Sequence, residues 1–331
     1  MSAVYSGSYC NIAADSFNEL FWDRVHNIHP PSTDLSRMSA GTYPEQIPKS
    51  QQQLEGVIFD IDLKAGFGTD AVAIKTWTAI LENYSGTRLG YESDRLITIS
   101  GLAERMRAAS DQTLRYAAGF WVSSSDHGDV IYQLCWKRAV AEKAPDTYQA
   151  PSWSWASAPG RILLGSRSRI GKTQLSSSIK DTSYYPCNVL NWSVETEGSN
   201  LMGKALSGLL CLEGPLFPIK LSMKSRSIHC LLGSVHVLLD FFLDDNGDKF
   251  KLIGNFCLAV LSIIPSVLTR GYALLLRPIG RFRGHYERIA FVHIYFLGGH
   301  PEQGIEQMEG APEDIYKTYD EESGKYTFTI I

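Results

Sequence analysis

Apolar residues recur at helical spacing in the first half of the chain. In three stretches they return about every three to four positions, which places them on one face of an α-helix. Asp94 and Asp129 precede two of these stretches, and an Asp side chain can accept hydrogen bonds from the free N–H groups at the start of a helix. The predicted helical faces are Ile74, Trp77, Ile80, Leu81 and Tyr84; Leu96, Ile99, Ala103 and Met106; and Ile131, Leu134, Cys135 and Arg138.

After Pro151 the pattern changes to short β-type runs separated by turn residues. Asp245-Asn-Gly-Asp and Glu322-Ser-Gly-Lys are typical of β-hairpins, because Asn and Gly tolerate a positive φ. Helical stretches followed by strands predict an α+β fold, in which an N-terminal and middle helical segment packs on a mostly antiparallel, β-rich C-terminal domain. The predicted strands are residues 153–155, 189–194, 206–212, 235–243, 272–276, 289–297 and 326–331.

The longest apolar stretch, residues 256–276, is interrupted by Pro265 and Arg270. A membrane-spanning helix needs about 20 mainly apolar residues, so we expect two buried strands here instead. Trp153 and Trp155 would share one face of their strand, and we expect both rings to be buried where the helices meet the β-rich half. Paired tryptophans could alternatively stack a ligand.

Composition and charge exclude several classes of protein. The chain has 331 residues, with 31 Lys and Arg against 35 Asp and Glu, which gives a net charge of −4. This balance offers no electrostatic case for binding nucleic acid or an anionic membrane. The first residues lack the basic and apolar regions of a signal peptide, and the six cysteines form no C-x-x-C pair. We therefore expect a cytoplasmic protein whose reduced cysteines lie in its core, namely Cys10, Cys135, Cys187, Cys211, Cys230 and Cys257.

Two glycine-rich segments are similar to nucleotide-binding loops but depart from their patterns. Five residues separate Gly165 from Gly171-Lys-Thr, whereas a phosphate-binding loop has four, and no amphipathic helix follows. Gly66-Phe-Gly-Thr-Asp-Ala71 has the spacing of a dinucleotide fingerprint, but no second βαβ unit follows it. We interpret this second segment as a turn that leads into a helix. The sequence therefore predicts no cofactor and no cofactor-binding residue.

Acidic residues and histidines form no metal or catalytic pattern. Asp244-Asp-Asn-Gly-Asp lacks the ligand spacing of a calcium loop, and we interpret it as a solvated hairpin turn. The eight histidines do not cluster, and neither H-E-x-x-H nor G-x-S-x-G occurs. The sequence predicts no metal ligand and no catalytic residue.

A series of short motifs runs through most of the chain in a fixed order. The motifs are Met1-Ser-Ala-Val-Tyr-Ser-Gly-Ser-Tyr-Cys-Asn-Ile-Ala-Ala14, Asp94-Arg-Leu-Ile-Thr-Ile-Ser-Gly-Leu-Ala103, Tyr116-Ala-Ala-Gly-Phe-Trp121, Leu134-Cys-Trp136, Ala150-Pro-Ser-Trp-Ser-Trp-Ala-Ser157, Tyr272-Ala-Leu-Leu-Leu-Arg-Pro278, Tyr286-Glu-Arg-Ile289 and Tyr326-Thr-Phe-Thr-Ile-Ile331. Together they resemble fungal heterokaryon incompatibility (HET) proteins, which read D-R-L-x-A-I-S-G-L-A, Y-L-A-G-L-W, L-L-W, A-P-S-W-S-W-A-S, L-L-L-x-P and Y-x-R-I-G in the corresponding places. Residues 1–14 resemble the last helix and strand of the HET domain itself.

The resemblance implies a role in fungal nonself recognition, heterokaryon incompatibility and the associated programmed cell death. The resemblance makes residues 1–25 a remnant of the end of a HET domain. The Pro- and Gln-rich composition of residues 26–56 predicts a loop or linker, and the apolar patterns predict a mainly helical segment at 57–150 and the β-rich domain at 151–331. The family motifs S-Y-x-W-G, D-x-L-C-I-x-Q and R-x-W-x-x-Q-E are absent. We therefore expect a truncated protein that lacks most of the HET core, and we transfer no catalytic residue from the family.

The leading hypothesis is a non-enzymatic accessory region of a HET-like protein. We expect it to bind a protein partner, which the sequence does not identify. We expect it to bind neither nucleic acid nor a membrane. One alternative is an enzyme with an unrecognised pocket in the β-rich half. Another is an interaction module for a separate HET core.

Overall fold

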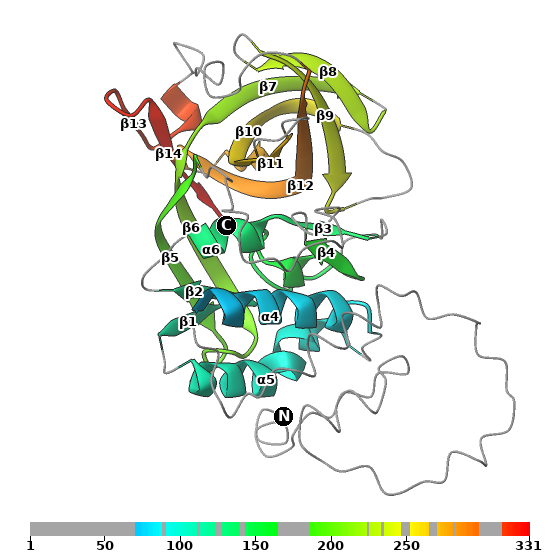
Figure 1. Ribbon diagram of the computed structural model, residues 1–331, viewed down its shortest axis with the longest axis vertical. Helices are drawn as coiled ribbons and strands as arrows, with labels where there is room; N and C mark the ends of the chain where they lie inside the picture. The colour runs from blue at the N-terminus through cyan, green and yellow to red at the C-terminus, as the bar shows by residue number, and fades with distance from the viewer. Residues whose placement is uncertain are drawn as a thin grey trace, which may run out of the picture.

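The computed structural model shows a curved β-sheet at one end of the molecule and a group of helices at the other (Figure 1). The α+β class and the β-rich C-terminal region agree with the expectation from the sequence. The structure describes residues 70–87, 91–110, 113–123, 128–139, 143, 145–164, 186–223, 225–232, 235–245, 252–264, 270–280, 282–297 and 313–331.

Several expectations fall outside these residues. They are the HET-domain remnant at 1–25, the linker at 26–56, a short strand at 57–63, the fingerprint glycines Gly66 and Gly68, the phosphate-loop candidate at 165–173, and Cys10. Within the described ranges, no helix is long and apolar enough to span a membrane.

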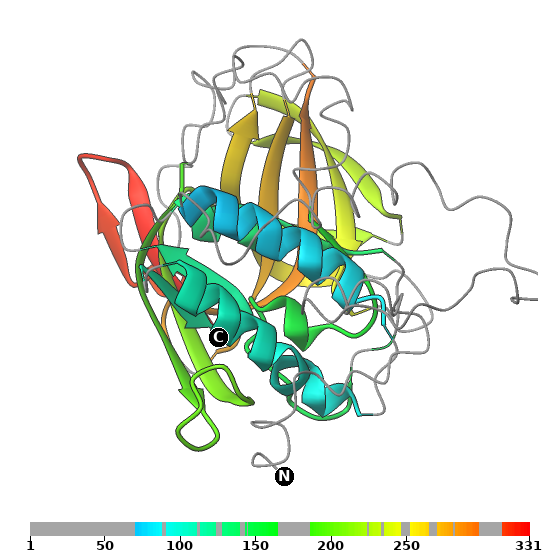
Figure 2. The same cartoon turned by 60° about the horizontal axis from the view of Figure 1, so that its bottom comes forward.

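The first two predicted helical faces lie on α4 and α5, and Ile131 and Leu134 of the third lie on α6. Helix α5 lies farthest from the curved sheet in both views (Figure 1 and Figure 2). The third helix is shorter than predicted: it ends at Leu134, and Arg138 belongs to a strand. That strand, β3, pairs with β4, so tertiary pairing overrides the helical spacing. The elements are α4 (Asp70–Tyr84), α5 (Arg95–Ala109), α6 (Gly128–Leu134), β3 (Trp136–Arg138) and β4 (Ile162–Leu164).

Six antiparallel strands form the curved sheet and wrap around an apolar interior (Figure 1). In pairing order they are β7 (Leu216–Met223), β10 (Leu252–Ile264), β11 (Arg270–Pro278), β12 (His285–Phe296), β9 (Val235–Leu243) and β8 (Ser227–Leu232). We call these six strands the curved sheet.

A second group of strands joins the curved sheet to the helices. β5 pairs with β6, β6 pairs with β14, and β14 runs parallel to β12 over two residue pairs, His285 with Thr329 and Tyr286 with Ile330. The small hairpin of β1 and β2 lies within the range predicted as mainly helical. These strands are β5 (Asn188–Thr196), β6 (Ala205–Gly214), β13 (Thr318–Asp320), β14 (Lys325–Ile330), β1 (Leu114–Ala117) and β2 (Phe120–Ser123).

Strands β10, β11 and β12 are buried on both faces. Val260, Ala273 and Val292 point into the curved sheet, whereas Leu274 and Phe291 belong to the core shared with the helices. Neighbouring residues of a strand point to opposite faces, so burial on both sides requires a nearly continuous apolar sequence. This double burial explains the stretch 256–276 and confirms that it forms two buried strands.

The segment around Trp153 and Trp155 is a turn and a short 3-10 helix, η3 (Trp155–Ser157), so the predicted strand is wrong. The Ser154 hydroxyl caps this helix by accepting a hydrogen bond from the Ala156 N–H group. The expected burial is confirmed, since the two tryptophans are 1% and 0% exposed. Because the chain turns between them, their rings do not share a strand face.

The two indole rings pack against different partners. Trp155 lies edge-on to Tyr84 of α4, with ring centroids 5.9 Å apart, and Trp153 lies 5.7 Å from Phe120 of β2. Trp155 Nε1 donates a hydrogen bond to the Gly119 carbonyl at 3.0 Å. A Cβ atom on Gly119, whose φ is +96°, would meet that same nitrogen at 2.3 Å, so only glycine fits this turn.

The two predicted hairpins have different outcomes. Residues 321–324 connect β13 to β14 in an antiparallel hairpin, as expected. The prediction of a hairpin at Asp244–Asp248 is wrong, because the strands on either side of this segment, β9 and β10, do not pair with each other. Strand β9 pairs with β8 and β12, whereas β10 pairs with β7 and β11. Asp244 is not an exposed turn residue either, because its side chain is only 11% exposed: its N–H group donates to the Ile289 carbonyl, and its carboxylate faces a buried arginine.

Replacing Trp155 with Ala tests the packing at this turn. We expect Trp155→Ala to lower the free energy of unfolding by about 3–5 kcal/mol, because it leaves a large cavity in a buried core. Urea unfolding measures the change, and Phe282→Ala is the matched control because Phe282 is 67% exposed. A loss no larger than that of the control would contradict the packing assigned to Trp155.

Candidate functional site

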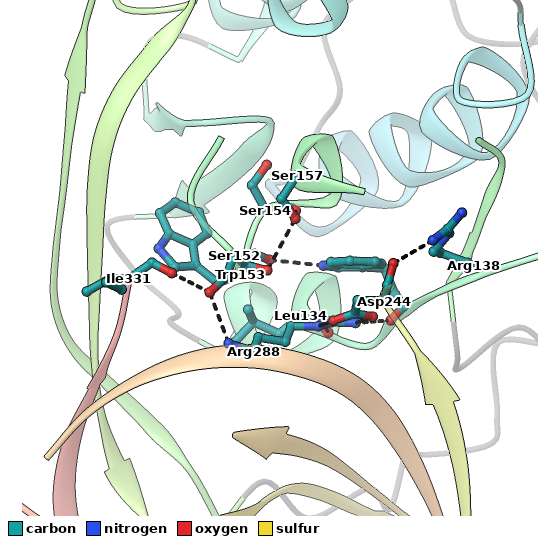
Figure 3. Close-up of polar contacts among 10 residues, drawn as sticks. Leu134, Arg138, Ser152, Trp153, Ser154, Ser157, Asp244, Arg288 and Ile331 are labelled. Carbon is teal, nitrogen blue, oxygen red and sulfur yellow. Dashed lines mark hydrogen bonds and ion pairs between the residues drawn. The ribbon is translucent and has the colours of Figure 1, made fainter. Parts of the chain in front are cut away.

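The candidate site lies where the curved sheet meets the helices, and Arg288 of β12 is at its centre (Figure 3). The Arg288 side chain is 0% exposed. Its Nε donates to Asp244 Oδ2 at 2.8 Å, its Nη1 to the Leu134 carbonyl at 2.7 Å, and its Nη2 to the Trp136 carbonyl at 2.6 Å. The guanidinium carbon also lies 3.5 Å from the centre of a Trp136 ring. One side chain therefore joins β12, the end of α6, β3 and the end of β9.

Asp244 is the anionic partner in this junction. A second arginine, Arg138, donates through Nη1 to the Asp244 backbone carbonyl at 2.6 Å. Burial raises the pKa of Asp244, and the positive charges of Arg288 and Arg138 oppose that rise. Burial likewise lowers the pKa of Arg288, and Asp244 opposes that change. The Arg288 guanidinium is hydrogen-bonded to two backbone carbonyls as well as to the Asp244 carboxylate, which is the arrangement that a buried cation requires.

Ser152 links the tryptophan turn to this junction. Its N–H group donates to the Ile331 carbonyl at 2.9 Å, and its hydroxyl donates to the same oxygen. The Arg288 N–H group in turn donates to the Ser152 hydroxyl at 3.0 Å (Figure 3). The Ser152 hydroxyl is therefore occupied as donor and acceptor, and it is not presented as a nucleophile.

A groove of about 1050 Å³ opens beside the junction. Leu209 of β6 and Ile253 of β10 expose apolar surface in it, at 45% and 56%. Arg277 and Glu287 form an exposed ion pair at 2.7 Å on adjacent strands of its wall. We call this the junction groove.

Apolar side chains, hydroxyl groups and ion pairs line the junction groove. Among the described residues, neither a histidine nor a cysteine lines it. Groups of three or more His, Cys, Asp or Glu that could hold a metal ion are absent from the described part of the chain. Arg288 faces Asp244 and Arg277 faces Glu287 as ion pairs. One hydroxyl group of the groove, that of Ser207, donates to the exposed Glu195 carboxylate at 3.1 Å.

The cysteines belong mainly to the core. Cys135, Cys187 and Cys257 are buried and free, as predicted, and burial raises their pKa values to about 12, 12 and 11. Their thiols are therefore protonated at neutral pH, and a protonated thiol is a poor nucleophile. Cys211 and Cys230 are also free and only half-buried.

No family model matches this chain, and no curated protein or solved structure matches it.

The sequence interpretation named no site residue, and it missed both partners of the buried ion pair. Asp244 was assigned to a solvated turn because acidic residues beside Asn-Gly are usually exposed. Its position directly after the apolar pattern of β9 was a signal that its side chain could be buried. Arg288 lies inside Tyr286-Glu-Arg-Ile289, a motif that also carries the resemblance to HET proteins.

Breaking the ion pair tests how much the junction depends on it. We expect Arg288→Met to lower the free energy of unfolding by about 3–5 kcal/mol, because Asp244 would remain buried and unpaired. Arg277→Met removes the exposed pair with Glu287 and should cost below about 1 kcal/mol. Urea unfolding of both variants provides the comparison.

A double variant distinguishes charge from packing. Arg288→Met combined with Asp244→Leu should recover part of the lost stability, because no uncompensated charge is left. A double variant less stable than Arg288→Met would contradict the electrostatic account.

Proposed function

We propose that this chain is a non-enzymatic accessory region of a HET-like protein, with a role in fungal nonself recognition and the associated cell death. It acts in the cytoplasm and binds a protein partner through the junction groove. It requires no cofactor, and it binds neither nucleic acid nor membranes.

The observation that carries the proposal is the convergence of the HET-like motifs on one buried junction. Arg288, Trp136 and Ser152 come from three of these motifs, and Arg288 contacts the other two there. Gly119, from a fourth motif, accepts hydrogen bonds from Trp77 Nε1 at 2.8 Å and from Trp155 Nε1 at 3.0 Å. Motifs far apart in the sequence thus build one scaffold.

Arg95 shows the same structural use of a motif residue. It comes from the Asp94-Arg-Leu motif and is 4% exposed. Its guanidinium donates to the carbonyls of Ala158, Ser85 at 3.1 Å and Gly160 at 2.8 Å. Donors bonded to backbone carbonyls hold loops in place and are not available to a substrate, which supports a structural role for the motifs.

The junction groove supports the protein partner. It is open, and it presents exposed apolar side chains beside an exposed ion pair. An apolar centre with a polar rim is typical of surfaces that bind other proteins. The motif residues beneath the groove would then fix its shape, and Leu209 and Ile253 would contact the partner.

Cell death in fungal hyphae tests this function. We expect death when the chain is expressed together with a HET core, and its loss when the chain carries Leu209→Asp and Ile253→Asp. Leu190→Asp is the matched control, because Leu190 is 49% exposed on β5 and lies outside the groove. Vital-dye staining measures death, and immunoblotting establishes equal amounts of each variant.

Two outcomes would contradict the proposal. Equal death with the groove variant and with the control would exclude the groove as the partner surface. Turnover of NAD, ATP or GTP by the purified chain would favour the enzyme alternative.

A further inference from the structure

A second cavity, of about 370 Å³, lies on the outer face of the curved sheet where it approaches β3. Tyr272 of β11, His293 of β12 and Asp240 of β9 are cross-strand neighbours in one row. Arg270 and Tyr295 form the next row on the same face. All five therefore lie on the face opposite the sheet's apolar interior, and four of them line the cavity, Asp240 being the exception. We call it the basic cavity.

Positive charge is concentrated around the basic cavity. Lys137 Nζ and the Arg226 guanidinium lie 4.0 Å and 3.9 Å from the centre of the Phe242 ring. Arg270 lines the cavity from β11. Asp240 forms an ion pair with Arg226 at 3.0 Å. Three cations therefore face one carboxylate among the described residues.

The ammonium group of Lys137 contacts no carboxylate among the described residues. The residue is 8% exposed, and no hydrogen bond or ion pair reaches its ammonium group from the described residues. Burial lowers the pKa of Lys137, and the nearby Arg226 lowers it further, although Asp240 opposes the change. An ammonium group on a side chain of such low exposure, with an aromatic ring and no carboxylate in contact, loses part of its hydration, and a bound anion would offset that loss.

His293 and Arg270 add unpartnered donors to the same cavity. His293 Nε2 and Arg270 Nε are buried, and neither has a hydrogen-bond partner. His293 Nδ1 lies 3.3 Å from the Tyr295 hydroxyl. If this hydroxyl donates to Nδ1, the proton of the neutral ring is on Nε2, where it can be donated to a ligand.

We propose that the basic cavity binds a phosphate monoester dianion, with the phosphate between Lys137, Arg270 and His293 and the organic part against the aromatic rings. Three cations and one carboxylate leave a formal charge of +2, which matches a dianion. Tyr272, Tyr295 and Phe242 supply an apolar wall. Cavities of this size hold small molecules.

The pH dependence of stability gives a first test of the cavity's charge. Burial and the cations Lys137, Arg226 and Arg270 lower the pKa of His293 to about 3, against an ordinary value near 6.5. Below pH 6.5 the unfolded chain therefore takes up a proton that the folded state does not. We expect the folding equilibrium constant to fall by up to about tenfold per pH unit below 6.5.

Thermal or urea unfolding at pH 7, 6 and 5 measures this dependence. His293→Gln should lose that part of the pH dependence, and added inorganic phosphate should reduce it in the wild type, because a bound anion favours protonated His293. An unchanged pH profile in His293→Gln would contradict the charge environment assigned to the cavity.

Calorimetric titration with inorganic phosphate and with phenyl phosphate tests binding directly. We expect Lys137→Met, which keeps an unbranched side chain on Phe242, to weaken binding at least tenfold. Arg270→Gln, at the half-buried edge of the cavity, should weaken it as well. Lys220→Met is the matched control, because Lys220 is exposed on β7 outside the cavity and its loss should leave binding unchanged.

The expected result is saturable phosphate binding, tighter for phenyl phosphate, together with a shift of the His293 ring proton signal in the NMR spectrum. Equal binding by the Lys137→Met variant and wild type, equal affinity for acetate, or no binding at millimolar phosphate would overturn the proposal. None of these outcomes depends on a HET partner, so they leave the proposed function untouched.

Discussion

The buried guanidinium of Arg288 is the interaction on which the junction depends. It has no exposed surface, so each of its donors must find an acceptor inside the protein. Those acceptors come from the end of α6, from β3 and from the residue after β9. A charge buried in this way is stable only when all these segments are in place, because any missing acceptor leaves a donor unpaired. Arg288 therefore selects one arrangement of helices and sheet over other compact arrangements.

The central strands impose a second constraint. β10, β11 and β12 bury one face inside the curved sheet and the other against the helical core. A sheet covered on both sides has no solvent face on which polar residues could alternate. The helices and the curved sheet therefore share one apolar core, and the interior of the curved sheet is a second one. Trp153 and Trp155 belong to the shared core.

The junction groove and the basic cavity differ in whether their charged side chains are paired. Beside the junction groove, Arg288 and Asp244 satisfy each other, so the charge serves the scaffold. In the basic cavity, the Lys137 ammonium contacts the Phe242 ring and no carboxylate among the described residues, and the histidine beside it is held neutral. A satisfied pair stabilises structure, whereas an excess of one sign at low exposure favours a ligand of the opposite sign. We therefore assign scaffolding to the first site and anion binding to the second.

The sequence by itself determined the elements whose pattern is local. Periodic apolar residues identified α4 and α5, Gly324 marked the turn before β14, and the apolar stretch 256–276 indicated two buried strands. Only the tertiary structure decided the end of α6, the turn at Trp153, the burial of Asp244 and both cavities. Each of these depends on partners more than 20 residues away along the chain, such as Asp244 for Arg288 or Phe242 for Lys137. Local spacing carries no information about such partners, because the energy that decides these features comes from pairing and burial after the chain has folded.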